Sequence, residues 1–364
     1  ALYLTIGPFF AIPRCATTAF TVSIEQAVPQ AAERLRLWLL VFSAVFFAAA
    51  LLFSLFPGKI LTWVGKILNP FFLLFLGILI IVALVKPSAA ISAVAPEGAY
   101  ASQAFSTGFL EGYNTMDVLA GLAFGIIVVQ VIRELGVTDA DAVASSTVKA
   151  GVFSSLLMAL IYLAVTVVGA QSRGLFATSE NGGIALAQIA RHYLGSAGLV
   201  ILAATVTLAC LKTSVGLITS CAETFCGMFP KGPGYRAWAV LFTLISFALS
   251  NFGLSTIISY SVPVLMFLYP LAIALVLLAL FGRFYRHDRA VYISVIVCTL
   301  LAALYDLICA LPEGLYDALH ADAVQAFGLR VLPFAGAGLG WICPLALGFV
   351  IGLAVHLMQK FRTK

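Results

Sequence analysis

A single arginine lies inside the apolar run that opens this chain. The run reads Thr5-Ile-Gly-Pro-Phe-Phe-Ala-Ile-Pro-Arg14 and contains two prolines as well. A charge and two helix-breaking residues are all costly in hydrocarbon, so a segment that keeps them is a place to look for function. A guanidinium offers a planar pair of donors that matches a carboxylate. Arg14 therefore either binds a substrate's carboxylate or pairs with an acid of the protein, such as Asp117 or Glu111.

A second polar stretch interrupts a long apolar segment. It reads Glu111-Gly-Tyr-Asn-Thr-Met-Asp117, and an apolar run follows it. Gly112 and Asn114 are poor helix formers, and Thr115 or Asn114 could cap a new helix at the end of the stretch. Two half-helices that meet in a membrane expose backbone groups, which transporters use to hold substrates and cations. In the alternative interpretation, residues 100–115 form an outer loop and the second acid marks a helix start near the interface.

Two hydroxyls and a thiol share one face of a later apolar segment. Cys210, Thr213 and Ser214 are spaced i, i+3 and i+4, which places them on one side of a helix. A hydroxyl pair with free carbonyl oxygens nearby suits a hard cation, whereas membrane-helix hydroxyls also bond to carbonyls of their own preceding turn. Both interpretations stay open at this point. Lys212 is adjacent in sequence, and its ammonium needs a partner, a water-filled cavity or a position near the interface.

The composition indicates a polytopic membrane protein. Hydrophobic residues make up 62% of the 364 and charged residues only 10%, against about a quarter in an ordinary soluble domain. The 20 Lys and Arg residues are scattered over loop positions, so the net charge of +5 does not indicate nucleic-acid binding. Neither a Ser/His/Asp array nor a Walker loop nor a Cys/His cluster is visible, which argues against an enzyme or a bound metal.

Ten apolar stretches are long enough to cross a membrane as helices. We expect them at about 1–24, 37–56, 60–85, 104–132, 146–170, 197–222, 236–251, 255–281, 290–311 and 335–358. The chain is therefore predicted to be one all-α transmembrane domain over residues 1–364.

The positions of Lys and Arg predict the orientation of these spans. If the tail with Lys360, Arg362 and Lys364 is cytoplasmic, twelve Lys and Arg residues fall on the inner side and six on the outer side. The other two, Arg14 and Lys212, fall within spans. We therefore expect a cytoplasmic C-terminus, and with ten spans the chain starts on the same side.

The motifs resemble a known family of carriers. The run from Thr5 to Arg14 is similar to the hallmark segment of the bacterial branched-chain amino acid carriers of the BrnQ type, the LIV-cation symporters. Three further stretches are similar to the same family: Asn69-Pro-Phe-Phe-Leu-Leu, Glu111-Gly-Tyr-Asn-Thr-Met-Asp117 with Ala120-Gly-Leu-Ala-Phe-Gly125, and Ala209-Cys-Leu-Lys-Thr-Ser-Val-Gly-Leu-Ile-Thr219.

This resemblance implies a twelve-helix carrier with a LeuT-like inverted repeat in the bacterial cytoplasmic membrane. Such a carrier imports leucine, isoleucine and valine together with Na⁺ or H⁺ and has no organic cofactor. Members of the family have two further helices ahead of the hallmark segment. The ten spans would then be helices three to twelve of an N-terminally truncated chain. Exchange or export of amino acids by the same fold is the alternative.

The resemblance also implies where substrate and cation bind. The interrupted segment would be the sixth helix, and its amino acid site would be formed by Gly112, Tyr113, Asn114 and Thr115, lined in addition by Phe9 and Arg14. The segment 197–222 would be the eighth helix, whose Cys210, Thr213 and Ser214 resemble the small-x-x-hydroxyl-hydroxyl pattern of a sodium site. Asp117 and Lys212 are further charges expected within the membrane, and Lys212 leaves the coupling ion undecided.

Overall fold

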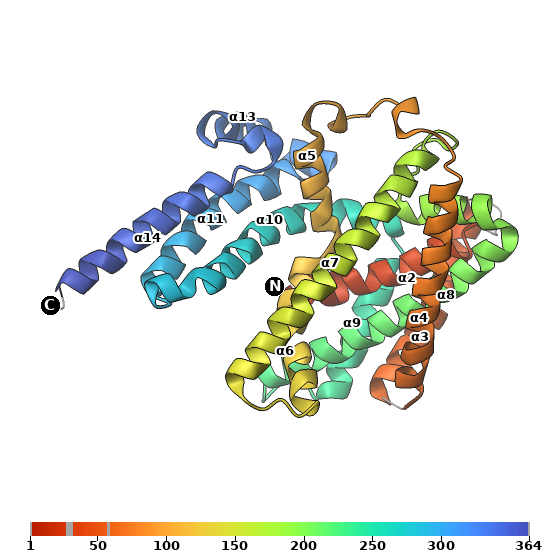
Figure 1. Ribbon diagram of the computed structural model, residues 1–364, viewed down its shortest axis with the longest axis horizontal. Helices are drawn as coiled ribbons and strands as arrows, with labels where there is room; N and C mark the ends of the chain where they lie inside the picture. The colour runs from red at the N-terminus through yellow and green to blue at the C-terminus, as the bar shows by residue number, and fades with distance from the viewer. Residues whose placement is uncertain (1, 27–31, 57–58, 363–364) are drawn as a thin grey trace. The chain divides into compact units, whose positions relative to one another are not determined.

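The computed structural model describes residues 2–26, 32–56 and 59–362 (Figure 1). Over these residues the chain is helical and contains no β-strand, which confirms the predicted all-helical fold for this part of the chain. The Asn69 side chain and those of the predicted cytoplasmic tail, Lys360, Arg362 and Lys364, lie outside the described residues.

The helices form two compact units. The first comprises Tyr3–Ala95 and Ile126–Ile257, and the second comprises Pro96–Gly125 and Ile258–Lys364. Helix α6 (Asp117–Glu134) therefore begins in the second unit and ends in the first. Each unit is described by itself below.

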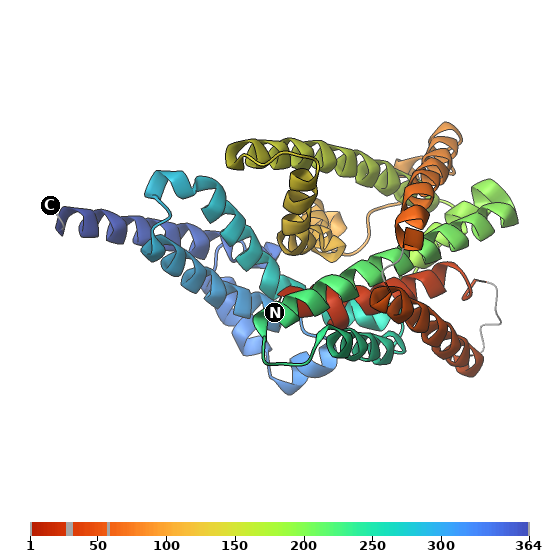
Figure 2. The same ribbon diagram turned by 90° about the horizontal axis from the view of Figure 1, so that it is seen from below.

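The first unit is built around its longest helix, α8 (Gly182–Met228) (Figures 1 and 2). Five helices contact α8: α2 (Ala11–Val22), α3 (Ala32–Leu55), α4 (Lys59–Val85), α7 (Ala140–Ser172) and α9 (Tyr235–Ser250). Apolar side chains from these helices form a buried core that includes Val22, Leu79, Val168, Leu202 and Val206. The unit thus places the opening run of the chain, in and before α2, directly against α8.

Two predicted spans of this unit have different bounds in the structure. The span expected at 1–24 is not one helix, because a wide π-type turn (Thr5–Phe9) separates α1 (Leu2–Leu4) from α2. Gly7 is non-helical there and Pro8 has no N–H to donate. Helix α8 starts well before the predicted residue 197, and its non-helical break at Gly195, with φ +64°, divides it near that position.

Helix α10 (Leu254–Phe281) begins in the first unit and continues in the second. The second unit also contains α5 (Tyr100–Glu111), α11 (Arg289–Cys309) and α14 (Ile342–Arg362). Helix α11 packs along α14, and the last turns of α10 join them in a buried core with Leu278, Tyr285, Val291 and Val295. Two short helices that the sequence analysis did not anticipate, α12 (Glu313–Ala318) and α13 (Asp322–Val331), follow α11. The last predicted span began too early, because a short helical turn (Ala335–Ala337) and Gly338, at φ +68°, precede α14.

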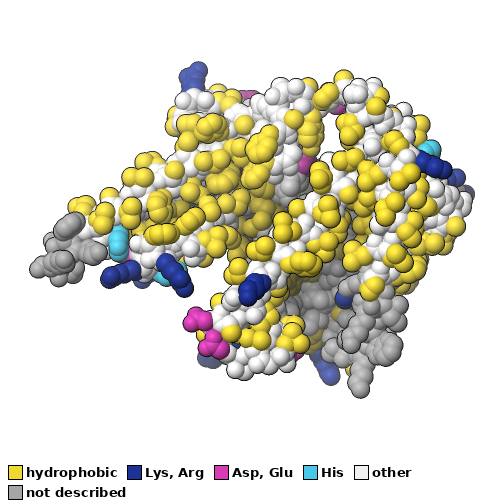
Figure 3. All heavy atoms as spheres, viewed as in Figure 1, with side chains coloured by type: hydrophobic (Ala, Val, Ile, Leu, Met, Phe, Trp, Pro, Cys, Tyr) yellow, Lys and Arg dark blue, Asp and Glu magenta, His cyan; other side chains and the backbone are white. Residues whose placement is uncertain are grey.

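Six of the described helices are long and apolar enough to cross a membrane, or seven if the bent pair Tyr100–Gly125 and Val128–Glu134 counts as one span. Helix α9 and the segment Pro70–Val85 are shorter apolar helices. On α7, large apolar side chains face outward, with Phe153 72% and Leu156 67% exposed. Figure 3 shows hydrophobic side chains spread over the outer surfaces of the helices. These features fit a membrane helix bundle, whereas the number of ten spans stays a prediction.

Helices α11 and α14 approach closely through two glycines spaced four residues apart. A Cβ at Gly348 would lie 2.7 Å from the carbonyl oxygen of Ser294, and one at Gly352 would lie 2.6 Å from the Cα of Val291. Small residues at this spacing let the backbones of membrane helices meet. At the end of the pair, His356 hydrogen-bonds Asp288, which also caps α11, and these bonds hold the pKa of Asp288 below its usual value.

We predict that Gly348→Val and Gly352→Val each destabilise the protein. The added side chain meets backbone atoms that cannot rotate away, so the helices must separate at a cost of about 1–3 kcal/mol. Thermal unfolding in detergent measures the effect. Ala346→Val, at an exposed position of the same helix, is the matched control, and equal unfolding temperatures for all three variants would contradict the prediction.

Candidate substrate and cation sites

The predicted interruption between α5 and α6 is present. Helix α5 ends at Glu111, a tight turn covers Gly112–Thr115, and α6 starts at Asp117. Between them Met116 adopts a left-handed conformation with φ +61°. The Thr115 hydroxyl donates to the Gly112 carbonyl oxygen at 2.8 Å and accepts from the Asp117 N–H at 3.4 Å. The structure therefore confirms both the break and the hydroxyl cap at the start of the second helix.

This break presents groups of opposite partial charge in one short segment. The last carbonyl groups of a helix carry partial negative charge, and its first N–H groups carry partial positive charge. Here the end of α5 and the start of α6 are separated by only the turn and Met116. Gly112 and Thr115 are exposed and Asn114 is half-buried, with its amide donating to Glu111 at 2.8 Å. Such a segment can bind both ends of a small zwitterion.

Tyr113 anchors the break in the interior of the second unit. Its ring stacks on Tyr269 of α10, with 4.2 Å between the ring centroids, and Phe109 contacts it edge-on at 5.6 Å. Tyr113 is 4% and Tyr269 2% exposed, yet neither hydroxyl has a partner with hydrogen-bond geometry among the described residues. Buried hydroxyls are normally satisfied, so these two are available to a ligand or to water.

Two further polar residues that the sequence analysis did not place here surround the Tyr113 hydroxyl. The indole N–H of Trp341 lies beside it, and the carboxylate of Asp306 lies within electrostatic range. Asp306 is buried in α11 with 7% exposure. A charged residue inside an apolar span is itself a signal of function, and it could have identified Asp306 from the sequence. Nothing local to Tyr269 or Trp341 marks them as neighbours of Tyr113.

The opening run, in the first unit, is held by α8 and α9. Residues Thr5 to Pro8 are buried, and a Cβ on Gly7 would lie 2.6 Å from the Cys221 sulfur. The Ser246 hydroxyl donates to the Pro8 carbonyl oxygen at 3.3 Å. The backbone carbonyl of Pro8 therefore faces protein. Phe9 is 41% exposed and Arg14 half-buried, and their roles at a substrate site stay predictions.

The candidate cation residues separate into two kinds. The Thr213 hydroxyl is exposed and donates to the Ala209 carbonyl oxygen of its own helix at 3.0 Å. The Ser214 hydroxyl is fully buried and lies, with the Cys210 thiol, against Cys15 of α2, without a partner of hydrogen-bond geometry among the residues described. Thr213 thus bonds to a carbonyl of its own preceding turn, whereas the Ser214 hydroxyl faces the Cys15 thiol.

The expected site residues are divided between the two units. Gly112, Tyr113, Asn114, Thr115 and the half-buried Asp117 belong to the second unit. The first unit contains Phe9, Arg14, Cys210, Thr213, Ser214 and the half-buried Lys212. Within each unit the structure brings together one cluster, Tyr113 with Tyr269 and Cys15 with Ser214.

Comparison with known proteins identifies the family. The sequence model of the family described as "Branched-chain amino acid transport protein" matches residues 1–359. The chain belongs to this family. It is 50% identical to the branched-chain amino acid permease BrnQ of Lactobacillus delbrueckii subsp. lactis over 361 residues, 99% of this chain and 80% of that protein. The BrnQ permease of Bacillus subtilis (strain 168) is 37% identical over 364 residues, 100% of this chain and 79% of the relative. No solved structure matches.

In this member of the branched-chain amino acid transport protein family, two buried serines provide a stability test. Ser246→Ala leaves the Pro8 carbonyl oxygen without its donor, which costs about 1–3 kcal/mol for a buried group. Ser214→Ala removes a hydroxyl that has no well-formed bond, so we expect stability to stay the same or to rise slightly. Thermal unfolding of the two variants in detergent checks this. Equal losses in both would show that Ser214 is a structural residue.

Proposed function

We propose that this protein imports leucine, isoleucine and valine across the bacterial cytoplasmic membrane by symport with Na⁺ or H⁺. The observation that carries the proposal is the break at Gly112–Met116, where an interrupted membrane helix lies beside two buried, unsatisfied tyrosine hydroxyls. Membership of the family and the names of the relatives, branched-chain amino acid permeases, support the substrate class.

The break offers groups that can bind the carboxylate, the ammonium and the side chain of an amino acid. Its carboxylate is bound by N–H groups at the start of α6, where the Tyr269 hydroxyl lies next to Thr115 and the backbone of Met116 and Val118. Its ammonium is bound by carbonyl groups at the end of α5. The rings of Tyr113 and Phe109 provide apolar surface for an aliphatic side chain. A hydrophobic pocket separates side chains that differ by one methylene by only about 1–3 kcal/mol, so all three substrates are accepted.

The coupling cation binds at the Ser214 hydroxyl. This oxygen is buried in α8 and unsatisfied, and Cys210 on the same helix face lies next to it. Thr213 bonds within its own helix and has to exchange that bond before it can bind the ion. Lys212 is half-buried one position away, and its ammonium opposes a second positive charge nearby. We propose Na⁺ as the coupling ion, with H⁺ as the alternative.

The transport cycle follows from the LeuT-like inverted repeat that we propose for the complete fold. Substrate and cation bind from outside, the gates rock, and both are released to the cytoplasm, where the C-terminus lies. Exchange or export by the same fold is the alternative function. It differs in one measurable respect, because exchange requires amino acid on the opposite side of the membrane.

We expect gradient-dependent uptake of radiolabelled isoleucine into proteoliposomes that hold the protein expressed from its complete gene. An inward Na⁺ gradient should drive accumulation, with a pH gradient as the comparison. Ser214→Ala should raise the Na⁺ concentration for half-maximal uptake about tenfold or more, and Thr213→Val should change it less. Absence of accumulation under either gradient would refute symport, and uptake only into preloaded liposomes would indicate exchange.

A tyrosine pair in α10 tests the substrate site. Tyr269→Phe keeps the ring that stacks on Tyr113 and removes the hydroxyl beside the break, so we expect KM for isoleucine to rise about tenfold at unchanged thermal stability. Tyr260→Phe, at an exposed position of the same helix, serves as the control. An unchanged KM in Tyr269→Phe would place the substrate elsewhere.

A further inference from the structure

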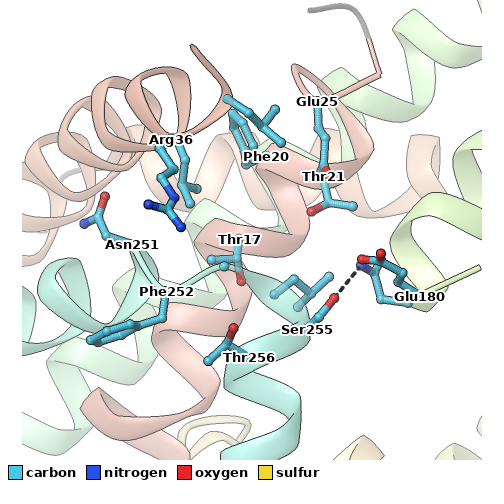
Figure 4. A pocket seen from close by; sticks show the side chains of 15 residues that line it. Thr17, Phe20, Thr21, Glu25, Arg36, Glu180, Asn251, Phe252, Ser255 and Thr256 are labelled. Atoms are coloured by element: carbon cyan, nitrogen blue, oxygen red, sulfur yellow. Dashed lines mark hydrogen bonds between the residues drawn. The ribbon is translucent and has the colours of Figure 1, made fainter. Parts of the chain in front are cut away.

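A cavity of about 230 Å³ opens where several helix ends of the first unit converge (Figure 4). Its walls come from the end of α2, the start of α3, the turn before α8, and the junction between α9 and α10. None of the residues assigned above to substrate or cation lines it. The cavity is therefore a separate site within this unit.

Charges of both signs line this cavity. Arg36 of α3 extends toward Thr17 of α2 and Asn251, and Glu180 lies on the other side of Thr17 in Figure 4. Glu25, just after α2, adds a second carboxylate, which has another interaction of its own. Arg36 and Glu180, both exposed at the mouth of the cavity, thus offer a bidentate donor for a carboxylate and an acceptor for an ammonium.

The wall between these charges is held in place by hydrogen bonds. Asn181 caps α8 by accepting from Gly183 and Ile184 at 3.1 and 3.2 Å, and its amide donates to Ser255 at 3.3 Å, the dashed line in Figure 4. Asn251 donates to the Phe247 carbonyl oxygen at 2.6 Å. The turn before α8 and the first turn of α10 are therefore fixed to each other. A fixed wall lowers the entropic cost of binding.

Apolar side chains complete the lining: Phe20, Leu35, Leu39, Phe252 and Leu254. A ligand of this cavity therefore meets one cation, two anions and an aliphatic and aromatic surface. A ligand with charges of both signs can pair with the guanidinium and with a carboxylate at once, which neither a lone cation nor a lone anion can do. A small zwitterion with an apolar side chain satisfies all three.

We infer that this cavity is a second binding site for an apolar α-amino acid, with Arg36 on its carboxylate, Glu180 on its ammonium and Phe20 and Leu39 on its side chain. The volume lies below the range of about 300–1,000 Å³ for drug-sized ligands and fits a single amino acid. The inference rests on the proposed function. In the proposed orientation, residues 25, 35 and 36 and the chain segments 173–191 and 251–255 face outside, so the site holds substrate on the side from which it arrives.

The number of leucine molecules bound per protein tests this inference. In equilibrium binding of radiolabelled leucine to the purified full-length protein, we expect two sites, of which the weaker loses affinity about tenfold or more in Arg36→Gln and in Glu180→Gln. The matched controls are Arg34→Gln and Glu33→Gln, exposed on α3 and not part of the lining. Isocaproate, which lacks the ammonium, and isoamylamine, which lacks the carboxylate, should compete poorly at the weaker site.

The outcomes are separable from those of the proposed function. Leucine binding at the remaining site shows that a variant is folded. If Arg36→Gln loses leucine binding at both sites, the test of the second site rests on Glu180→Gln, in the turn before α8. One leucine per wild-type protein with normal uptake would overturn the second site and leave the proposed function standing. Two leucines in wild type and in both variants would overturn the assignment to this cavity. If the wild-type protein neither binds leucine nor takes up amino acid, both proposals are overturned.

Discussion

The need to satisfy every backbone polar group without water governs this structure. A helix interior meets that need by itself, so each interruption of a helix in hydrocarbon requires other partners. Two of the interruptions among the described residues are resolved in different ways. At the first, around Gly7 and Pro8, the Ser246 hydroxyl donates to the Pro8 carbonyl oxygen and the Cys221 thiol donates to the Tyr3 carbonyl oxygen just before the run. At the second, Thr115 satisfies its own turn and two tyrosine hydroxyls nearby keep unused capacity.

This difference separates a break that the rest of the protein closes from the break that we propose to bind the substrate. The first break is closed by side chains of α8 and α9, so it fixes α2 against its neighbours and leaves little for a ligand to bind. The second break is closed only locally. The same reasoning applies to hydroxyls within one turn of α8, where Thr213 is satisfied by its own helix and Ser214 is not. Unused hydrogen-bonding capacity, more than polarity, marks the places where a ligand can be held.

The sequence predicted the features that depend on neighbouring residues. Gly112, Asn114 and Thr115 located the second break because helix propensity and capping act over a few positions. The sequence could not show that Tyr269 and Trp341 lie next to Tyr113, since both are far from Tyr113 along the chain and no periodic pattern links them. Nor could spacing show which of Thr213 and Ser214 bonds within its own helix, because Ser214 faces Cys15 of α2, which is distant in the sequence. The helix ends were shifted where Gly195 and Gly338 turn the backbone to positive φ.

Met116 shows how narrowly the second break constrains the sequence. Its backbone adopts a left-handed conformation that costs a residue with a side chain about 1–2 kcal/mol and that glycine would adopt freely. Yet its side chain is 5% exposed, so glycine there would leave unfilled volume in the second unit. The position is therefore under two opposing selections, one for conformational freedom and one for bulk. Few amino acids satisfy both. The fold alone therefore restricts the residue types that can stand at this position, whether or not the residue touches a substrate.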